Sequence, residues 1–316
     1  MTVELGEGDF RYEALPEWEQ LPDGVTLVEV PGVAVDANDT VFVLSRNTEH
    51  PVMVFEADGS FLRSWGAGTF SARTHGIWIG PEGDVFCADD GTHTITRWTP
   101  EGELEQTLGV PNEPAAAWSG QPFNRPTHAA ISPRSGDLFV TDGYGNSCVH
   151  RFSPDGKHLL TWGEPGIDAG QFIRPHNLAI DDEGLIYVAD RECHRVQVFD
   201  EEGHFVTMWS NIHRPDGLTL AADGNIYIGE LNGFPGVDTA PGLGHRVSVL
   251  NRDGELLARF GHPEEGEGAG HFIAPHGIAV DSRGDIYVGE VSTTIRGRGL
   301  DPPREMKSLK KLRRLP

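Results

Sequence analysis

The sequence has few cysteines, few basic residues and no long apolar run. Its three cysteines, Cys87, Cys148 and Cys193, show no CxxC spacing, which argues against a disulfide framework or a thiolate zinc site. Lys and Arg number 25 against 48 Asp and Glu, and this net charge of −23 argues against a nucleic-acid or membrane partner. No stretch approaches the ~20 apolar residues of a membrane span. The start of the chain shows no secretory pattern, so we expect a cytoplasmic protein.

Glycine and proline are abundant, with 40 and 22 of the 316 residues, more than a helical bundle tolerates. The chain instead repeats one pattern: a run such as GIAVD, a turn that ends in Gly, a run such as IYVAD, a polar gap, a run such as RVQVF and a run that ends in Trp-Gly. The first two runs of the six copies occupy residues 31–46, 75–90, 127–142, 176–191, 216–230 and 276–290.

Each run is short, alternating and rich in Val, Ile, Phe and Tyr, which indicates β-strands. Four strands in each of six units predict an all-β fold, a six-bladed β-propeller of four-stranded blades over residues 1–294. The sixth copy lacks its last runs, so we expect the N-terminal segment 10–15 to supply a strand that closes the ring. Residues 231–244 lengthen a loop of the fifth blade.

Residues 295–316 read as a basic C-terminal tail, with eight basic and two acidic residues. Since the rest of the chain is strongly acidic, we expect the tail to pack against it. A role in oligomerisation or in binding another partner is the alternative, and the composition leaves the oligomeric state open.

Two positions of each repeat are expected at one mouth of the central channel, because the antiparallel second strand returns to the end where the first strand begins. The first of these positions is Gly32, His75, Thr127, His176, Asp216 and His276 in order around the ring. The histidines stand in alternate repeats, 101 and 100 residues apart, and would meet near the axis. Three imidazoles with an open fourth position are a catalytic zinc arrangement that other divalent metals also accept. The alternative is a structural role in packing between blades.

The second position adds polar side chains at the same mouth. Arg46 and Arg191 end the second runs of their repeats, and Tyr144 closely follows such a run. Arginine can clamp a substrate carboxylate, and a tyrosine beside a metal and an arginine can act as a base. The alternatives are a solvated loop for Arg46 and Tyr144, and an inter-blade ion pair for Asp190-Arg191. His128, one place past the first position, is compatible with a structural or a site role.

The repeats resemble NHL repeats. More narrowly, the segments THGIWI, FNRPTHAAISPRSGDLFVTDGYGNS, GQFIRPHNLAI and APHGIAV resemble the peptidyl-α-hydroxyglycine α-amidating lyases. The resemblance extends from roughly residue 31 to 290. It implies a Zn²⁺ ion held by His75, His176 and His276. The family's calcium-binding Asp corresponds to Gly277, so the resemblance leaves a structural Ca²⁺ open.

The chemistry that the resemblance implies is cleavage of the C–N bond of an N-acyl carbinolamine to an amide and glyoxylate. Tyr144 matches the family's essential tyrosine and would remove the hydroxyl proton as phenolate. Arg46 matches the active-site arginine, which would stabilise that phenolate and orient the substrate carboxylate, and Arg191 matches a further arginine of the mouth. The implied partner is a small or peptide-derived substrate that carries a carboxylate.

Two other functions remain open. The first is a propeller hydrolase, such as a calcium-dependent lactonase at the same mouth, although three imidazoles suit calcium poorly. The second is a non-catalytic NHL scaffold that binds a protein or peptide on one face. The natural substrate and the identity of the metal stay open in either case.

Overall fold

The structure, a computed structural model, describes residues 3–80, 82–234, 240 and 242–316. The chain forms two compact units: a first unit of Met1–Trp65 with Asp216–Pro316, and a second unit of Gly66–Pro215. Strands of the described residues form six antiparallel sheets, three in each unit. The all-β, six-bladed propeller fold predicted from the repeats is confirmed.

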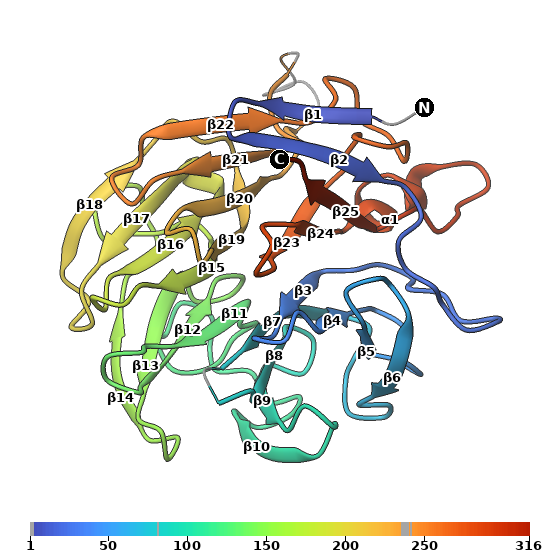
Figure 1. The fold of residues 1–316 in the computed structure, drawn as a ribbon. Helices are drawn as coiled ribbons and strands as arrows, with labels where there is room; N and C mark the ends of the chain where they lie inside the picture. The colour runs from blue at the N-terminus through green and yellow to red at the C-terminus, as the bar shows by residue number, and fades with distance from the viewer. Residues whose placement is uncertain (1–2, 81, 235–239, 241) are drawn as a thin grey trace. The chain divides into compact units, whose positions relative to one another are not determined.

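The second unit contains the blades of the second, third and fourth repeats. Figure 1 shows their first strands, β7, β11 and β15, as neighbours. The strands are β7 (Thr74–Ile79), β8 (Val85–Asp89), β9 (Thr94–Trp98), β10 (Leu104–Leu108), β11 (His128–Ile131), β12 (Leu138–Asp142), β13 (Cys148–Phe152), β14 (His158–Trp162), β15 (Pro175–Ile180), β16 (Ile186–Asp190), β17 (Arg195–Phe199) and β18 (Phe205–Trp209), with a short 3₁₀ helix η1 (Arg191–Cys193) after β16.

The first unit contains the blades of the first, fifth and sixth repeats. Part of the long loop at 231–244 lies outside the described residues. The elements are β1 (Val3–Glu7), β2 (Phe10–Leu15), β3 (Gly32–Val35), β4 (Val41–Leu44), β5 (Val52–Phe55), β6 (Phe61–Trp65), β19 (Pro215–Leu220), β20 (Ile226–Glu230), β21 (Arg246–Leu250), β22 (Leu256–Phe260), β23 (Pro275–Val280), β24 (Ile286–Glu290), α1 (Ser292–Ile295), η2 (Gly297–Gly299) and β25 (Leu309–Arg314). No helix of the described ranges is long and apolar enough to cross a lipid bilayer.

In the first, fourth and sixth repeats the turn between the first two strands is held by an aspartate: Asp36, Asp181 or Asp281. In the fourth repeat, Asp181 Oδ1 accepts hydrogen bonds from the amides of Glu183 and Leu185, at 3.0 and 2.8 Å. Gly184 adopts a φ of 86°, a conformation that favours glycine. Tyr187, from the next strand, donates to Asp181 Oδ2 at 2.9 Å. These three residues therefore close the end of the fourth blade opposite to the candidate site.

The register of the first two strands places both predicted site positions at one end of each blade. In the three blades that carry the predicted histidine ligands, the first strand pairs at its first residue with the last residue of the second strand. The pairs are Thr74 with Asp89, Pro175 with Asp190, and Pro275 with Glu290. The second residue of each of these three strands is a histidine: His75, His176 or His276. Each histidine therefore lies next to a strand end that carries a carboxylate.

The sixth blade is built from both ends of the chain, in the strand order β1-β2-β25-β24-β23. The expected closing strand at 10–15 is β2, and it pairs with β25 from Tyr12 opposite Arg314 to Leu15 opposite Lys311. The third strand of the blade, β25, lies inside the segment that the sequence analysis sets apart as a tail. A boundary at residue 294 therefore does not separate that tail from the blades.

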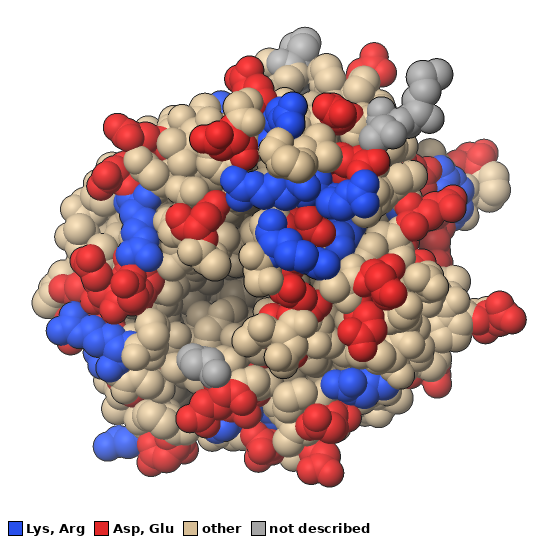
Figure 2. Space-filling model, viewed as in Figure 1, with Lys and Arg blue, Asp and Glu red and all other residues tan. Residues whose placement is uncertain are grey.

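Basic residues of this C-terminal segment pair with acidic residues of the first unit, as expected. Lys311 Nζ lies 3.1 Å from Asp285 and over the rings of Trp18 and Tyr287, at 5.5 and 4.8 Å from their centroids. Figure 2 shows Lys and Arg side chains gathered over β2 and β25. Further pairs are Arg296 with Glu265, Arg304 with Glu267, Lys307 with Glu19 and Arg313 with Glu13.

Leu312→Ala tests whether β25 contributes to the core. Leu312 is 1% exposed and packs with Tyr12, Phe260 and Val288. We expect the substitution to lower the free energy of unfolding by about 2–5 kcal/mol, measured by urea denaturation, because it leaves a cavity. The matched control is Leu300→Ala, since Leu300 is 39% exposed. Equal stability of the two variants would contradict the role of β25.

Candidate functional site

In the second unit, the hydroxyl of Tyr144 lies among three other predicted site residues. Its oxygen is 3.2 Å from His75 Nε2, 3.3 Å from His176 Nε2 and 3.4 Å from Arg191 Nη1. The two imidazole rings are 4.6 Å apart, and their potential ligand nitrogens lie within 4.8 Å of each other. Four residues that the repeat register brings to one mouth are therefore in contact.

Hydrogen bonding defines which nitrogen of His75 can bind a metal. Its Nδ1 lies 2.7 Å from the carbonyl oxygen of Thr127, which can only accept a hydrogen bond. Nδ1 therefore carries the proton, and Nε2 carries the lone pair that a metal needs. His75 and His176 are 2% and 1% exposed, so neither ring is a surface histidine. The pair fits a Zn²⁺ ion or another divalent metal that accepts imidazole.

In the first unit, His276 repeats this arrangement. Its Nδ1 lies 2.6 Å from the carbonyl oxygen of Pro31, so Nε2 again carries the lone pair, and the ring is 4% exposed. Gly277, at the position of the family's calcium ligand, packs directly on the backbone: an added Cβ would lie 2.7 Å from Gly32 Cα. This position offers no carboxylate and no space for one.

Arg46, also in the first unit, is held by hydrogen bonds to Glu29 and Thr294. Its Nη1 donates to Glu29 Oε2 at 2.5 Å and to Thr294 Oγ1 at 3.0 Å. The Arg46 side chain is only 11% exposed, and the Glu29 side chain 1%. The guanidinium therefore has a defined place beside a buried carboxylate.

Two glycines leave no space around the loop that carries Tyr144. A Cβ on Gly143 would lie 2.0 Å from the carbonyl oxygen of Pro175, and one on Gly145 would lie 2.1 Å from Asn124 Oδ1. Real Cβ atoms do not approach so closely, so the loop packs with its backbone against neighbouring segments. The tyrosine is thereby positioned by glycines on both sides.

A buried group of side chains anchors the same loop. Asp142 Oδ2 accepts hydrogen bonds from the amide of Asn124 at 2.8 Å and from Asn146 Nδ2 at 2.7 Å. It also lies 3.2 Å from His150 Nε2, which in turn is 3.5 Å from Cys148 Sγ. Burial, and then the charge of Asp142, raise the pKa of the Cys148 thiol. A neutral thiol and a histidine thus surround the carboxylate that fixes the Tyr144 loop.

The sequence analysis missed a set of arginines around Tyr144. Each of these arginines stands two residues before the residue at the first position of its repeat, such as His75 or His176. This constant spacing is a sequence signal from which the set could have been found. The set is Arg73, Arg125, Arg174 and Arg214, one in each of four consecutive repeats. The first and sixth repeats carry Val30 and Ala274 there.

Three guanidinium groups lie around the ring of Tyr144. Those of Arg125, Arg174 and Arg191 are 4.6, 4.9 and 5.6 Å from the ring centroid, distances at which cations interact with aromatic rings. Burial raises the pKa of Glu192, but its arginine neighbours, Arg191 first, outweigh burial and hold it below its usual value. The tyrosine therefore lies in a strongly positive part of an acidic protein.

Comparison with known proteins gives relatives along most of the chain. The family model of the NHL repeat matches residues 172–199. The chain is 31% identical over 281 residues to "NHL repeat-containing protein 3" of Homo sapiens, with 82% of this chain and 76% of that protein covered. It is 32% identical over 269 residues to "Peptidyl-alpha-hydroxyglycine alpha-amidating lyase 1" of Drosophila melanogaster, with 77% and 47% covered.

A third relative is much longer. The chain is 29% identical over 297 residues to "Peptidyl-glycine alpha-amidating monooxygenase B" of Xenopus laevis, with 89% of this chain but only 31% of that protein covered. Among solved structures, "Streptogramin B lyase structure" has a TM-score of 0.62 at 11% identity and covers 98% of this chain and 97% of its own. Such low identity shows a shared fold alone.

His128 predicts a pH dependence of stability. Burial lowers its pKa from 6.5 to about 4, and its Nδ1 has no hydrogen-bond partner among the described residues. Because the unfolded state binds this proton more readily between about pH 6.5 and pH 4, stability decreases as the pH falls through that window. Between pH 7 and pH 5 the loss from this group is about 2 kcal/mol.

The measurement is urea denaturation of the wild type and His128→Gln at both pH values, with matched metal content. We expect the variant to lose less stability on acidification than the wild type. An equal loss in both proteins would show that His128 is not the responsible group.

Proposed function

Because the chain belongs to the NHL repeat family, with lyases among its relatives, we propose that it is a metal-dependent lyase. The reaction is cleavage of the C–N bond of an N-acyl-α-hydroxyglycine, which yields an amide and glyoxylate. One observation carries the proposal: the Tyr144 hydroxyl lies within 3.2–3.4 Å of two imidazole nitrogens and an arginine. The residue proposed as the base, two of the proposed metal ligands and a cation thus lie around one point.

We propose that His75, His176 and His276 together hold the metal, most naturally Zn²⁺. They occupy the same position in alternate repeats, and in His75 and His276 a backbone carbonyl fixes the same tautomer. When bound, such an ion polarises the substrate hydroxyl or carboxylate as a Lewis acid. All of the remaining chemistry can be assigned to side chains of this chain.

Tyr144 is proposed to remove the hydroxyl proton of the substrate as phenolate. The electron pair of the O–H bond becomes the second bond of the aldehyde carbonyl, the C–N bond breaks, and the leaving amide nitrogen takes up a proton. No atom is gained or lost, since the two products together have the composition of the substrate. Arg46 is proposed to stabilise the phenolate and to orient the substrate carboxylate, and Arg191, 3.4 Å from the Tyr144 oxygen, adds to the stabilisation of the phenolate.

A second candidate function is a non-catalytic scaffold. The similarity to the human NHL repeat-containing protein 3 favours this function, because the name of that protein refers to its repeats and to no enzymatic reaction. A scaffold requires neither a bound metal at the three histidines nor release of glyoxylate. Metal content and turnover therefore separate the two functions.

Metal content tests the ligands. We expect about one zinc per chain, measured by elemental analysis, and loss of most of it in His176→Ala, because two imidazoles hold zinc weakly. The control is His204→Ala, whose side chain is 78% exposed and lies in a turn between β17 and β18. Wild-type metal content in His176→Ala would exclude the proposed site.

Removal of one oxygen tests the base. Tyr144→Phe keeps the ring between the arginines but deletes the hydroxyl, so the kcat of glyoxylate release should fall by about 100-fold to 10,000-fold. The assay uses N-pentanoyl-α-hydroxyglycine, and zinc content is measured in parallel to show that the metal remains. A variant that keeps both its zinc and its rate would rule out Tyr144 as the base.

A further inference from the structure

Arginines in the surroundings of Tyr144 share carboxylate partners. Asp90 and Glu192 each pair with more than one of these arginines, in a chain whose net charge is −23. Asp89, next in sequence, accepts hydrogen bonds from Ser71 and from backbone amides instead. The arginines are Arg73, Arg125, Arg174, Arg191 and Arg214.

The two carboxylates are already occupied by other arginines. Asp90 accepts two hydrogen bonds from Arg73, at 2.5 and 2.8 Å, and a longer one of 3.3 Å from Arg125. Glu192 likewise accepts two from Arg214, at 3.1 and 3.0 Å. Arg73 and Arg214 are therefore the principal partners, and Arg125 is held only weakly.

Arg174 shares Glu192 as well. Its Nη1 lies 3.2 Å from Glu192, while Arg191 Nε reaches the same carboxylate oxygen at 2.9 Å. Arg174 Nε is buried and has no hydrogen-bond partner within the described part of the chain.

Arg125 and Arg174 thus combine three properties. Their guanidinium groups lie within 4.9 Å of the centroid of the same tyrosine ring. Among the described residues, each has a single ion-pair partner, which it shares with another arginine, and each has five N–H donors to satisfy. Their side chains are 35% and 32% exposed, so a ligand can reach them. Both occupy the recurring arginine position, so the fold presents them on neighbouring blades of the second unit.

We propose that Arg125 and Arg174 bind a second anionic group, on the acyl side of the substrate. This inference rests on the proposed function, in which the glycine carboxylate is the first anion. The substrate class is then a dianionic N-acyl-α-hydroxyglycine, whose acyl chain ends in a carboxylate or another anion. Such a substrate gives Arg125 and Arg174 an anionic partner that they do not share with other arginines, which a neutral acyl group cannot supply.

Binding can be measured without turnover. N-Glutarylglycine and N-pentanoylglycine have acyl chains of equal length that end in a carboxylate and in a methyl group, and neither has the hydroxyl that cleavage requires. Isothermal titration calorimetry on the metal-loaded protein should give an affinity at least about tenfold higher for N-glutarylglycine, since a charge-assisted pair contributes that much or more.

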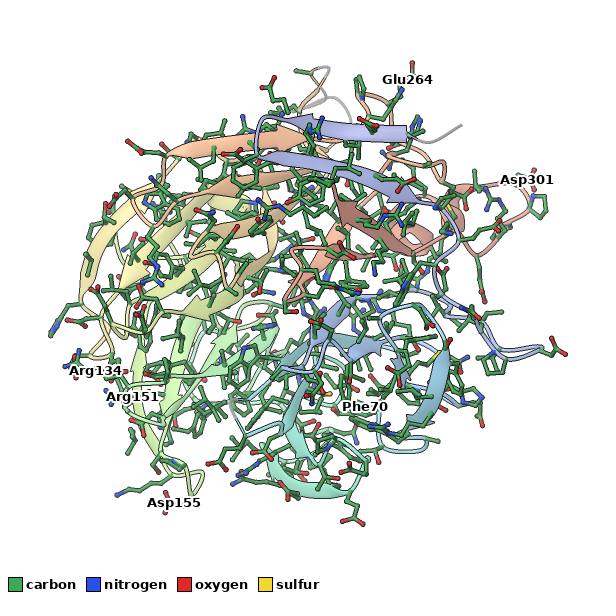
Figure 3. All side chains as sticks on the ribbon, in the orientation of Figure 1. Phe70, Arg134, Arg151, Asp155, Glu264 and Asp301 are labelled. Atoms are coloured by element: carbon green, nitrogen blue, oxygen red, sulfur yellow. The ribbon has the colours of Figure 1, made fainter. Side chains whose placement is uncertain are left out.

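The variants are Arg125→Gln and Arg174→Gln, and both should bring the ratio of the two affinities towards one. Arg125→Lys, which keeps the charge but not the planar donors, should retain part of the preference. The matched control is Arg134→Gln, because Arg134 lies at the outer edge of the β11–β14 blade (Figure 3) and is exposed. This control should keep the wild-type ratio.

Equal affinities in the wild type would overturn the inference, and so would a preference that survives in both glutamine variants. A preference lost equally in Arg134→Gln would contradict it too, because net charge would then be the cause. The proposed function fails separately: in that case N-glutaryl-α-hydroxyglycine releases no glyoxylate, whatever the calorimetry shows.

Discussion

The antiparallel return of each second strand is the constraint on which the candidate site depends. The last residue of the second strand lies beside the first residue of the first strand. Two positions that are separated in the sequence of a repeat, such as Pro175 and Asp190, are therefore neighbours at the same end of the blade. Hydrogen bonds from His75 and His276 to backbone carbonyls of neighbouring segments then orient the imidazoles. Backbone pairing thus determines both the place of the histidines and the nitrogen that they offer.

Much of this arrangement could be predicted from the sequence, because strand alternation and repeat length are strong signals. The contact of Tyr144 with His75, His176 and Arg191 follows from counting positions within each repeat. The contacts that hold the tyrosine loop could not be predicted in this way. They join Asp142 to Asn124, which precedes the strand, and such loop packing has no periodic pattern.

Two features lay outside the sequence analysis for physical reasons. The strand LKKLRR buries Lys310 and Lys311, 5% and 4% exposed, by pairing them with acidic and carbonyl oxygens. A pattern of apolar residues does not reveal such a strand, since lysines are seldom buried. The arginines around Tyr144 have a constant offset, but their common target becomes evident only when the distances of Arg125 and Arg174 to one ring are known.

The pairing of β2 with β25 also bears on the biogenesis of the protein. Tyr12 and Arg314 are paired in the ladder of β2 and β25, although they are far apart in the sequence. The strand β2 can therefore complete this pairing only after residue 314 has been synthesised. Until then, the nascent polypeptide exposes an incomplete sheet edge with unsatisfied amides and carbonyls. Formation of the last blade therefore depends on long-range closure rather than on a local hairpin, and contacts of this kind slow folding.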